Sequence, residues 1–230
     1  MGKTAKIQKI PKQPLAVTAY ETLVRKIICL EYQPSQHLEE NQLVDDLGIG
    51  RTPIREALVR LHSEKMVESH PKRGVIVRPI TLQNTKAMFE SMRIMERGIV
   101  DIAIHKNCST FIKKMKESNK EVEKAIGAND VFELVEANHE FHMNFAKCSQ
   151  NEFLIRAVQD VRSEAKRLSY LSYGNVIDPQ RPLKSHYESV FVEHEQIIES
   201  LIKKNEKQMK ELIEKHILTF RQRIIVFMTS

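Results

Sequence analysis

Residues 50–61 read Gly-Arg-Thr-Pro-Ile-Arg-Glu-Ala-Leu-Val-Arg-Leu, and this stretch decides how the N-terminal part of the chain folds. The apolar side of a helix over these residues would consist of Ile54, Leu58 and Leu61. Pro53 fits the first turn, where a backbone N–H has no helical partner. Arg51, Thr52 and Arg55 lie in or next to that turn. A helix with an apolar back and a basic N-terminal turn suits the major groove of DNA, where the first residues of a recognition helix meet base edges.

The preceding residues supply a partner for this helix. We expect a first helix at Ala16–Leu30 and a short second helix at Glu39–Leu47. Gly48 then provides a sharp turn, and Gly50 can cap the helix that follows, although Gly caps slightly less well than Ser. A helix, a turn with Gly and a second helix with a basic start form the pattern of a helix-turn-helix.

The following residues predict a hairpin. Two β-prone runs, Met66–His70 and Val75–Arg78, flank a turn that contains Pro71 and Gly74. Arg73 and Gly74 lie at its tip. Gly permits close approach of the backbone, and Arg carries the charge that a narrow minor groove attracts, so the hairpin can serve as a DNA-binding wing.

Residues 38–61, together with the Lys-Arg-Gly-Val-Ile-Val stretch at 72–77, resemble the winged helix of GntR-type bacterial transcription regulators. The resemblance implies that Arg51 and Arg55 read operator bases and that Thr52, next to Pro53, holds a phosphate. It also implies that Arg73 and Gly74 enter the minor groove. Gly50 departs from the pattern, which usually has Ser at this position.

From Thr81 to the C-terminus the sequence has only helical periodicity. Short breaks that contain Asn, Gly or Pro separate the helical stretches, which predicts an antiparallel bundle of about six helices. The expected helices are Leu82–His105, Thr110–Gly127, Val131–Ser149, Glu152–Tyr173, Pro182–Lys203 and Glu206–Met228. The predicted fold is therefore mainly α, with a basic mobile arm at 1–14, a winged helix-turn-helix at 15–79 and an all-helical domain at 80–230.

Three of the bundle helices carry histidines inside their apolar stripes. His142 lies between Phe141 and Phe145, with Asn138 one turn before it, and His194 and His216 lie at the centres of two later stripes. A buried imidazole without a partner costs a few kcal/mol, on the order of 1–3. One divalent ion would satisfy all three rings, and three nitrogens with one oxygen suit Zn²⁺, Ni²⁺, Mn²⁺ or Fe²⁺. Other candidate ligands are His105, His139 and His186.

The same residues are similar to the FCD effector domain of the FadR branch of the GntR superfamily. That resemblance implies a metal, Zn²⁺ or Ni²⁺, held by Asn138, His142, His194 and His216, with Asn138 at a position where Asp is usual. Asn brings an oxygen but no charge, so we expect a weaker hold on the metal. It also implies a small organic acid beside the metal. Arg93 matches an arginine near that pocket and can clamp a carboxylate in bidentate fashion, unless it pairs with Glu96.

Composition and charge agree with a DNA-binding protein of the cytoplasm. Residues 1–80 contain 13 basic and 9 acidic residues, whereas the rest contains 23 and 21, so the first third carries most of the net charge of +6. No apolar run is long enough for a membrane span, and no signal peptide is evident. Three Cys residues without a paired motif argue against a disulfide framework.

We therefore expect a homodimeric transcription regulator rather than an enzyme, and more specifically a repressor of a near-palindromic DNA operator, because a two-fold dimer places two recognition helices in successive major grooves. A small carboxylate and a metal would control its DNA binding. Two alternatives remain open at this point. One is a regulator whose helical domain holds no metal and whose histidines are hydrogen-bonded. The other is a helical metalloenzyme, which would use the same histidines around an open metal site.

Overall fold

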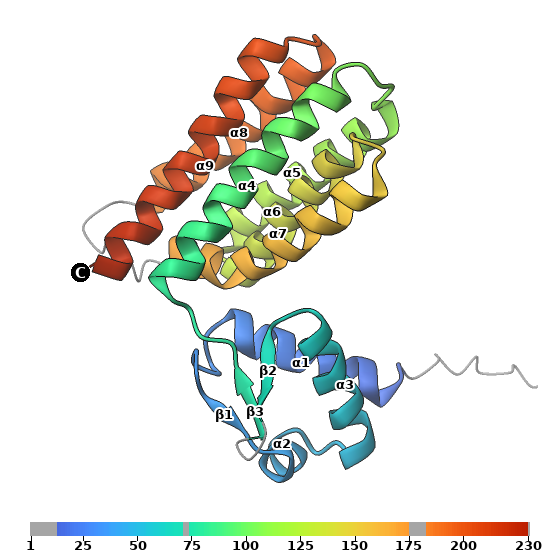
Figure 1. Ribbon diagram of the computed structural model, residues 1–230, viewed down its shortest axis with the longest axis vertical. Coiled ribbons are helices and arrows are strands. Elements are labelled where there is room, and N and C mark those ends of the chain that lie inside the picture. The colour runs from blue at the N-terminus through green and yellow to red at the C-terminus, as the bar shows by residue number, and fades with distance from the viewer. Residues whose placement is uncertain (1–12, 71–73, 175–182, 230) are drawn as a thin grey trace, which may run out of the picture.

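The chain folds into two lobes (Figure 1). They are joined by the segment between the strand at residues 74–77 and the helix that begins at residue 82. The computed structural model describes residues 13–70, 74–174 and 183–229. The first twelve residues, most of the predicted arm, lie outside this range, as does Arg73 at the predicted tip of the wing. The mainly α architecture, a winged helix followed by a helical bundle, is the one expected from the sequence.

The described part of the N-terminal lobe contains three helices and a small sheet. Its helices are α1 (Leu15–Ile28), α2 (Glu40–Leu47) and α3 (Arg51–Ser63). Gly48 ends α2 in a left-handed conformation, with φ of 65°, which lets the chain turn sharply into α3. The apolar side of α3 is buried against α1, because Ile54, Leu58 and Leu61 face inward as their spacing predicts.

The sheet has three antiparallel strands in the order β1-β3-β2. The hairpin strands are β2 (Val67–His70) and β3 (Gly74–Val77), with Val67 opposite Val77 and His70 opposite Gly74. The third strand, β1 (His37–Leu38), pairs with the outer side of β3 and is too short to leave a pattern in the sequence. The pairing of β1 anchors the wing to the segment that precedes α2.

The C-terminal lobe is a bundle whose long helices run side by side in Figure 1. Its described helices are α4 (Leu82–Ala103), α5 (Ser109–Ala128), α6 (Val131–Lys147), α7 (Glu152–Tyr173), α8 (Leu183–Ile202) and α9 (Glu206–Thr229). Side chains of Thr81, Asp130 and Asn151 accept hydrogen bonds from backbone N–H groups in the first turns of α4, α6 and α7. These caps explain why the helices begin where the sequence predicts.

Two groups of buried side chains hold the molecule together. One fills the centre of the bundle, and the other joins the winged helix to the near ends of α5, α6, α7 and α8. At this junction the Arg25 guanidinium of α1 lies 4.3 Å from the centre of the Phe132 ring of α6. Within the described ranges, no helix combines the length and the apolar character needed to cross a membrane.

Candidate DNA-binding surface and histidine cluster

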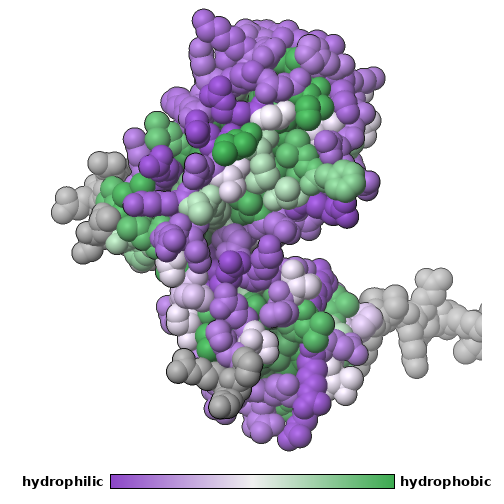
Figure 2. Space-filling model, viewed as in Figure 1, coloured by the Kyte–Doolittle hydropathy of each residue, from purple (hydrophilic) through white to green (hydrophobic). Residues whose placement is uncertain are grey.

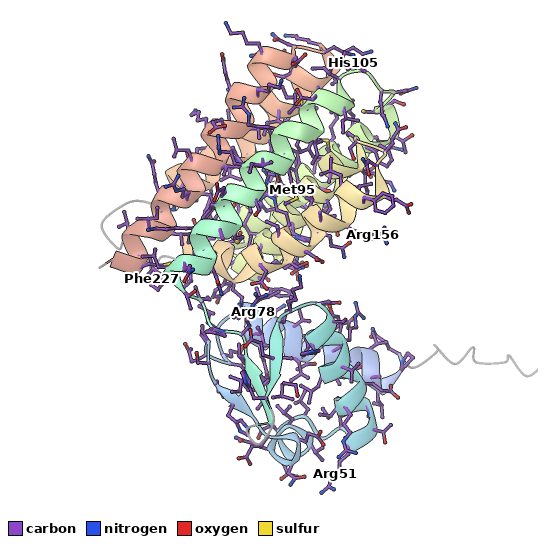
Figure 3. The ribbon with its side chains drawn as sticks, in the orientation of Figure 1. Arg51, Arg78, Met95, His105, Arg156 and Phe227 are labelled. Carbon is purple, nitrogen blue, oxygen red and sulfur yellow. The ribbon has the colours of Figure 1, made fainter. Side chains whose placement is uncertain are left out.

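The exposed side of α3 points away from the bundle. Arg51, at the start of the helix, lies at the far tip of the N-terminal lobe, opposite the bundle (Figure 3). Thr52 and Arg55 are exposed on the same helix, and Pro53 occupies its first turn. This is where a helix would present its N-terminal residues to a groove of DNA. The structure therefore brings the four candidate residues of α3 to one accessible surface.

Arg55 is held by a carboxylate from the preceding helix. Its Nε lies 2.8 Å from Oε2 of Glu40 on α2, and both side chains are largely exposed. An exposed pair of this kind stabilises the fold by roughly 0–1 kcal/mol. The pair limits the directions in which the Arg55 guanidinium can point.

Gly74 occupies the first position of β3, next to the residues that the structure leaves out. Its φ of 70° is left-handed, and a Cβ at this position would lie 3.0 Å from Nε2 of His37. Glycine is thus favoured by the left-handed backbone conformation, and a larger residue would also have to displace the His37 imidazole. Gly74 supports the wing, whereas the predicted contact of Arg73 with DNA lies outside the described residues.

Three histidines from three helices meet in the core of the bundle. His142 of α6 and His194 of α8 are fully buried, and His216 of α9 is almost so. One ring nitrogen of each lies within 4.8 Å of those of the other two, and Nε2 of His142 lies 3.2 Å from Nε2 of His216. The His194 ring also stacks on Phe141, with ring centres 3.7 Å apart. The sequence predicted this set, and the fold brings it together.

Second partners fix the orientation of two of these rings. Nδ1 of His194 donates to Oδ1 of Asn119 over 2.9 Å, and the Asn119 amide is itself held by Glu195. Nδ1 of His216 donates to Oε2 of Glu193 over 2.8 Å. Each ring therefore carries its proton on Nδ1 and turns the lone pair of Nε2 toward the other histidines. This tautomer is the one that binds a metal through Nε2.

The third ring, His142, has a different partner. Nη2 of Arg162 on α7 lies 2.8 Å from Nδ1 of His142, and Nε of Arg162 lies 2.6 Å from Oε1 of Glu96 on α4. All three side chains are buried. A guanidinium only donates hydrogen bonds, so Nδ1 of His142 must accept, and the proton of this ring lies on Nε2. His142 then donates to His216.

Burial and nearby charge keep two of these rings, His142 and His194, neutral. Burial lowers the pKa of His142 well below its ordinary value, and the Arg162 charge adds to the effect. Burial also lowers the pKa of His194, with a further contribution from His216. For Glu193, burial favours the neutral acid, but the hydrogen bond from His216 and the nearby charges lower its pKa overall. Neutral imidazoles are the form that a transition metal requires.

The donor set fits a divalent transition metal in most respects. Nε2 of His194 and Oδ1 of Asn138 are buried and have no hydrogen-bond partner among the described residues. Asn138 lies one turn before His142 on α6 and is also buried. A metal at the cluster would satisfy Nε2 of His194, and it would also satisfy Oδ1 of Asn138 if that oxygen were a ligand. The exception is His142, whose Nε2 carries a proton in this arrangement.

The other candidate histidines lie outside the cluster. His105 is exposed just beyond the end of α4. His139 has its Nδ1 buried without a partner among the described residues, and its imidazole lies close to the backbone of Arg162 on α7. His186 of α8 lies against Tyr173, with ring centres 5.5 Å apart, and its Nε2 is 3.4 Å from Oγ of Ser172.

Arg93, the residue predicted to hold an effector, lies on the outer side of α4. Its Nη1 is 3.5 Å from Oε1 of Glu214 on α9, and about half of its side chain is exposed. It lines a surface groove of about 440 Å³ between α4 and α9, with Phe89 and Arg221 among the neighbours. Glu96, its alternative partner in the sequence, points inward to Arg162 instead. The guanidinium beside the histidines is therefore that of Arg162, which the sequence did not single out.

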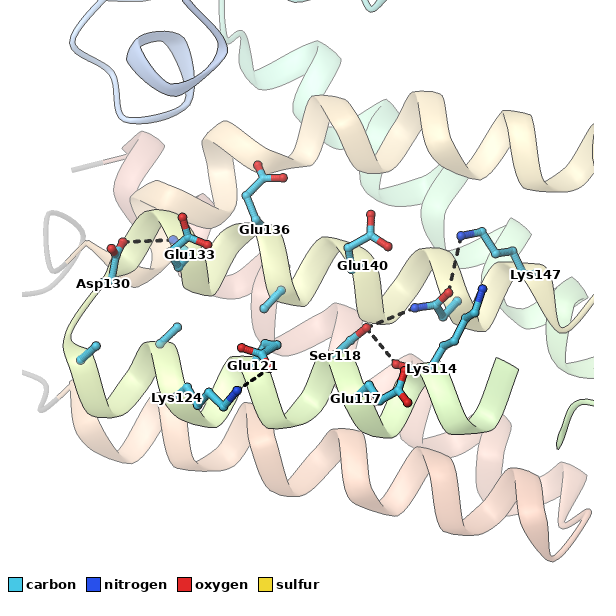
Figure 4. A pocket seen from close by; sticks show the side chains of 14 residues that line it. Lys114, Glu117, Ser118, Glu121, Lys124, Asp130, Glu133, Glu136, Glu140 and Lys147 are labelled. Atoms are coloured by element: carbon cyan, nitrogen blue, oxygen red, sulfur yellow. Dashed lines mark hydrogen bonds and ion pairs between the residues drawn. The ribbon is translucent and has the colours of Figure 1, made fainter. Parts of the chain in front are cut away.

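A larger hollow lies on the outer surface between α5 and α6 (Figure 4). Its volume is about 680 Å³, and its walls carry charges of both signs, including Lys114, Glu117 and Glu140. Nδ2 of Asn144 donates to Oγ of Ser118 over 3.1 Å at its wall. None of the three clustered histidines lines this hollow. It is thus separate from the buried cluster.

Comparison with known proteins gives a family for each lobe. Residues 15–77 match the model of the gntR family of bacterial regulatory proteins, and residues 87–219 match that of the FCD domain. The chain is 23% identical over 205 residues to the uncharacterized HTH-type transcriptional regulator YdhC of Bacillus subtilis, covering 88% of each chain. It is 20% identical to the HTH-type transcriptional repressor RspR of Escherichia coli over 80% of each chain.

Solved structures share the whole fold. A putative transcriptional regulator GntR from Rhodococcus sp. RHA1 superposes with a TM-score of 0.71 at 18% identity, over 91% of this chain and 97% of the other. McbR/YncC of E. coli gives a TM-score of 0.69 at 18% identity, over 91% and 98%. The matching families and relatives are regulators of transcription, not enzymes.

Proposed function

Because this chain belongs to the GntR family of bacterial transcription regulators and carries a C-terminal FCD domain, we propose that it is a repressor of the FadR branch whose operator binding is controlled from the helical domain. Its DNA-binding and regulatory assignment follows from the family. The repressor role is supported by the name of its relative RspR. The observation that carries the proposed control is the buried cluster of three histidines. We place the protein in the cytoplasm, where operators are found.

In this proposal α3 enters the major groove. Arg51 and Arg55 donate to base edges, where a bidentate arginine discriminates by about 1–3 kcal/mol per base pair. Thr52 binds a phosphate and Pro53 holds the first turn open to DNA. Gly74 lets the wing approach the backbone, and Arg73 supplies the charge that enters the minor groove.

Operator binding tests the role of α3. DNA selected by the wild-type protein from a random-sequence library provides the probe. Arg51→Ala and Arg55→Ala should each weaken binding by about 1–3 kcal/mol and relax specificity at one base position. Lys113→Ala, on an exposed part of α5 in the other lobe, is the matched control. Unchanged affinity, specificity and salt dependence in both arginine variants would contradict the assignment.

For the helical domain we propose a divalent transition metal, Zn²⁺ or Ni²⁺, held by Asn138, His142, His194 and His216. The two rings already oriented by Asn119 and Glu193 support this proposal. Such a metal would supply a Lewis-acidic position for the carboxylate of a small organic acid. The protein positions the imidazoles, excludes water from them and places the Arg162 guanidinium next to them. Arg93, which pairs with Glu214 on the outer side of α4, stays the candidate contact for the effector carboxylate.

Metal content gives the corresponding test. Protein purified without chelator should contain close to one Zn²⁺ or Ni²⁺ per chain, and His194→Ala should lose it. Adding Zn²⁺ at one hundred times its Kd should stabilise the wild-type protein by about 2.7 kcal/mol. Absence of metal and an unchanged melting temperature would favour a metal-free helical domain. The hydrogen bond between His142 and His216 is the observation that supports this alternative.

We also propose that the protein binds DNA as a two-fold dimer, because regulators of this family often act as dimers. The apolar surface over α4 and α7, visible in Figure 2 on the face where Figure 3 labels Met95 and Arg156, is the candidate interface. Ile94 on α4 is 60% exposed and Phe153 on α7 is 71% exposed. Large apolar side chains gathered on one face favour contact with a second copy.

A further inference from the structure

We propose that Arg162 is a positioning residue that transmits the state of the histidine cluster to the winged helix through α7. This inference rests on the proposed metal site and concerns how that site regulates DNA binding. It follows from two sets of contacts made by one helix, at His142 on one side and at the base of the wing on the other.

Arg162 and a metal place opposite demands on His142. In the structure, Nδ1 of His142 accepts from Arg162, which leaves the proton on Nε2. A metal held by the three Nε2 atoms needs the opposite tautomer, with the lone pair on Nε2 and the proton on Nδ1. His142 remains neutral in both states, because Nε2 loses its proton and Nδ1 gains one. Its Nδ1–H could not face a guanidinium N–H at 2.8 Å, so Arg162 has to move away.

Glu96 is placed to receive the displaced hydrogen bond. Its Oε1 lies 3.6 Å from Nδ1 of His142, and its Oε2 is buried without a hydrogen-bond partner among the described residues. A carboxylate behind a ligating histidine is a common arrangement in metal sites. Glu96 can thus exchange a hydrogen bond from Arg162 for one from His142, or use its second oxygen to keep both. Either way the Arg162 guanidinium shifts relative to α6.

The same helix holds the base of the wing. Two residues after Arg162, Glu164 pairs with Arg78, and three residues later Arg167 donates to the backbone carbonyl of Arg78. Arg78 follows β3 directly and lies at the junction of the two lobes (Figure 3). Arg167 is buried and Glu164 is partly buried, and this burial raises the pKa of Glu164 and lowers that of Arg167. At 1.5 Å of rise per residue, Arg167 is about 7.5 Å along α7 from Arg162.

One helix, α7, therefore contacts both sites. Arg162 moves when the tautomer of His142 changes. Glu164 and Arg167 hold Arg78, the residue that follows β3 of the wing. Asp160, on the same helix, adds an exposed contact of 3.4 Å to Lys65 at the end of α3. A displacement of Arg162 that shifts or rotates α7 would change the hold on both ends of the β2–β3 hairpin. Packed helices transmit such shifts because they do not deform continuously.

Two variants test the two contacts of α7 separately, Arg162→Gln at His142 and Glu164→Gln at Arg78. In Arg162→Gln the amide oxygen can accept from Nδ1–H of His142 while the amide nitrogen donates to Glu96, so the conflict with the metal disappears. Its affinity for Zn²⁺, measured against a competing chelator, should rise about tenfold or more. Glu164→Gln leaves the histidines untouched and should keep the wild-type Zn²⁺ affinity. Glu123→Gln, at an exposed position of α5 that takes no part in either site, is the matched control for both.

Amide hydrogen exchange measures whether Zn²⁺ binding at the histidine cluster changes the wing. Zn²⁺ should change the exchange rates of amides in residues 67–70 and 74–78 by at least about fivefold, in the full-length wild-type protein and in Glu123→Gln. The change should disappear in both Arg162→Gln and Glu164→Gln. A wild-type protein that binds no Zn²⁺ would overturn the proposed metal site and this inference with it. Zn²⁺ binding with the full exchange response retained in Glu164→Gln, or with weaker Zn²⁺ affinity in Arg162→Gln, would overturn the inference alone.

Discussion

Mild acid should destabilise the metal-free protein, because the folded state holds several histidines in their neutral form. Burial lowers the pKa of His142 and His194 far below the ordinary value. Burial also lowers the pKa of His139 and of His186 to about 3. In the unfolded chain each of these rings binds a proton near pH 6.5. The unfolded state therefore binds more protons than the folded state as the pH falls below that value.

The sign and size of the effect follow from this difference. Above pH 7 the rings are neutral in both states and contribute nothing to the pH dependence. Between pH 7.5 and 5.5 each ring that stays neutral only in the folded state lowers the free energy of unfolding by about 1.4 kcal/mol. The fully buried pair, His142 and His194, accounts for about 3 kcal/mol. With the partly buried His139 and His186 the loss reaches about 5.5 kcal/mol, comparable to the whole stability of many domains.

Urea unfolding in the presence of EDTA, at pH 7.5, 6.5 and 5.5, measures this loss directly. We expect the free energy of unfolding to fall along the whole series, with three to four protons bound on unfolding near pH 5.5. His139→Gln should lower that number by about one. His62→Gln, on the exposed side of α3, is the matched control and should retain the wild-type slope. A loss below about 1.5 kcal/mol over this range would refute the reasoning, because it would mean that the buried rings bind protons in the folded state.

Three further predictions concern single residues. Asn138→Asp should raise the affinity for Zn²⁺ by about tenfold or more, as isothermal titration would show, and equal affinities would argue that residue 138 does not bind metal. It should also destabilise the metal-free protein in urea unfolding, because an ionised carboxylate would be buried without a counter-charge. Ile94→Glu should convert the dimer to a monomer in analytical ultracentrifugation. Ile202→Glu, at another apolar site that is 52% exposed, should leave the dimer intact. Identical behaviour of the two variants would show that the interface does not include Ile94. Gly74→Ala should destabilise the winged helix by about 1–2 kcal/mol, because alanine must adopt a left-handed φ, and an unchanged urea midpoint would contradict that strain.

Helix positions could be predicted from the sequence because the helices have apolar stripes, and because α4, α6 and α7 also begin at a capping side chain. Asn151, for example, caps α7 where the pattern begins, and Gly48 turns the chain between α2 and α3. Strand β1 could not be predicted in this way. It has two residues, His37 and Leu38, and exists only because β3 lies beside it. A pairing between segments distant in sequence leaves no local pattern.

The histidine cluster could be predicted for a similar reason, since a polar ring in an apolar stripe is conspicuous. Its supporting residues could not. Arg162 and Glu96 are charged, and charged residues are ordinarily assigned to exposed helix faces. Yet these two residues, 66 positions apart in the sequence, are buried against each other. Arg93 illustrates the converse. It carries the charge expected of a carboxylate clamp, but it lies three residues before Glu96 and on the outer side of α4, so its effector role stays a prediction.

Operator affinity with and without metal tests the central claim, that the histidine cluster of the helical domain controls the DNA-binding surface of α3. The wild-type protein is stripped with chelator, reloaded with Zn²⁺, and titrated in both forms against the same library-selected DNA at one salt concentration. We predict that the two dissociation constants differ by at least about fivefold, which is the lower end of allosteric coupling between sites. Equal dissociation constants, in protein shown to hold one Zn²⁺ per chain, would contradict the claim.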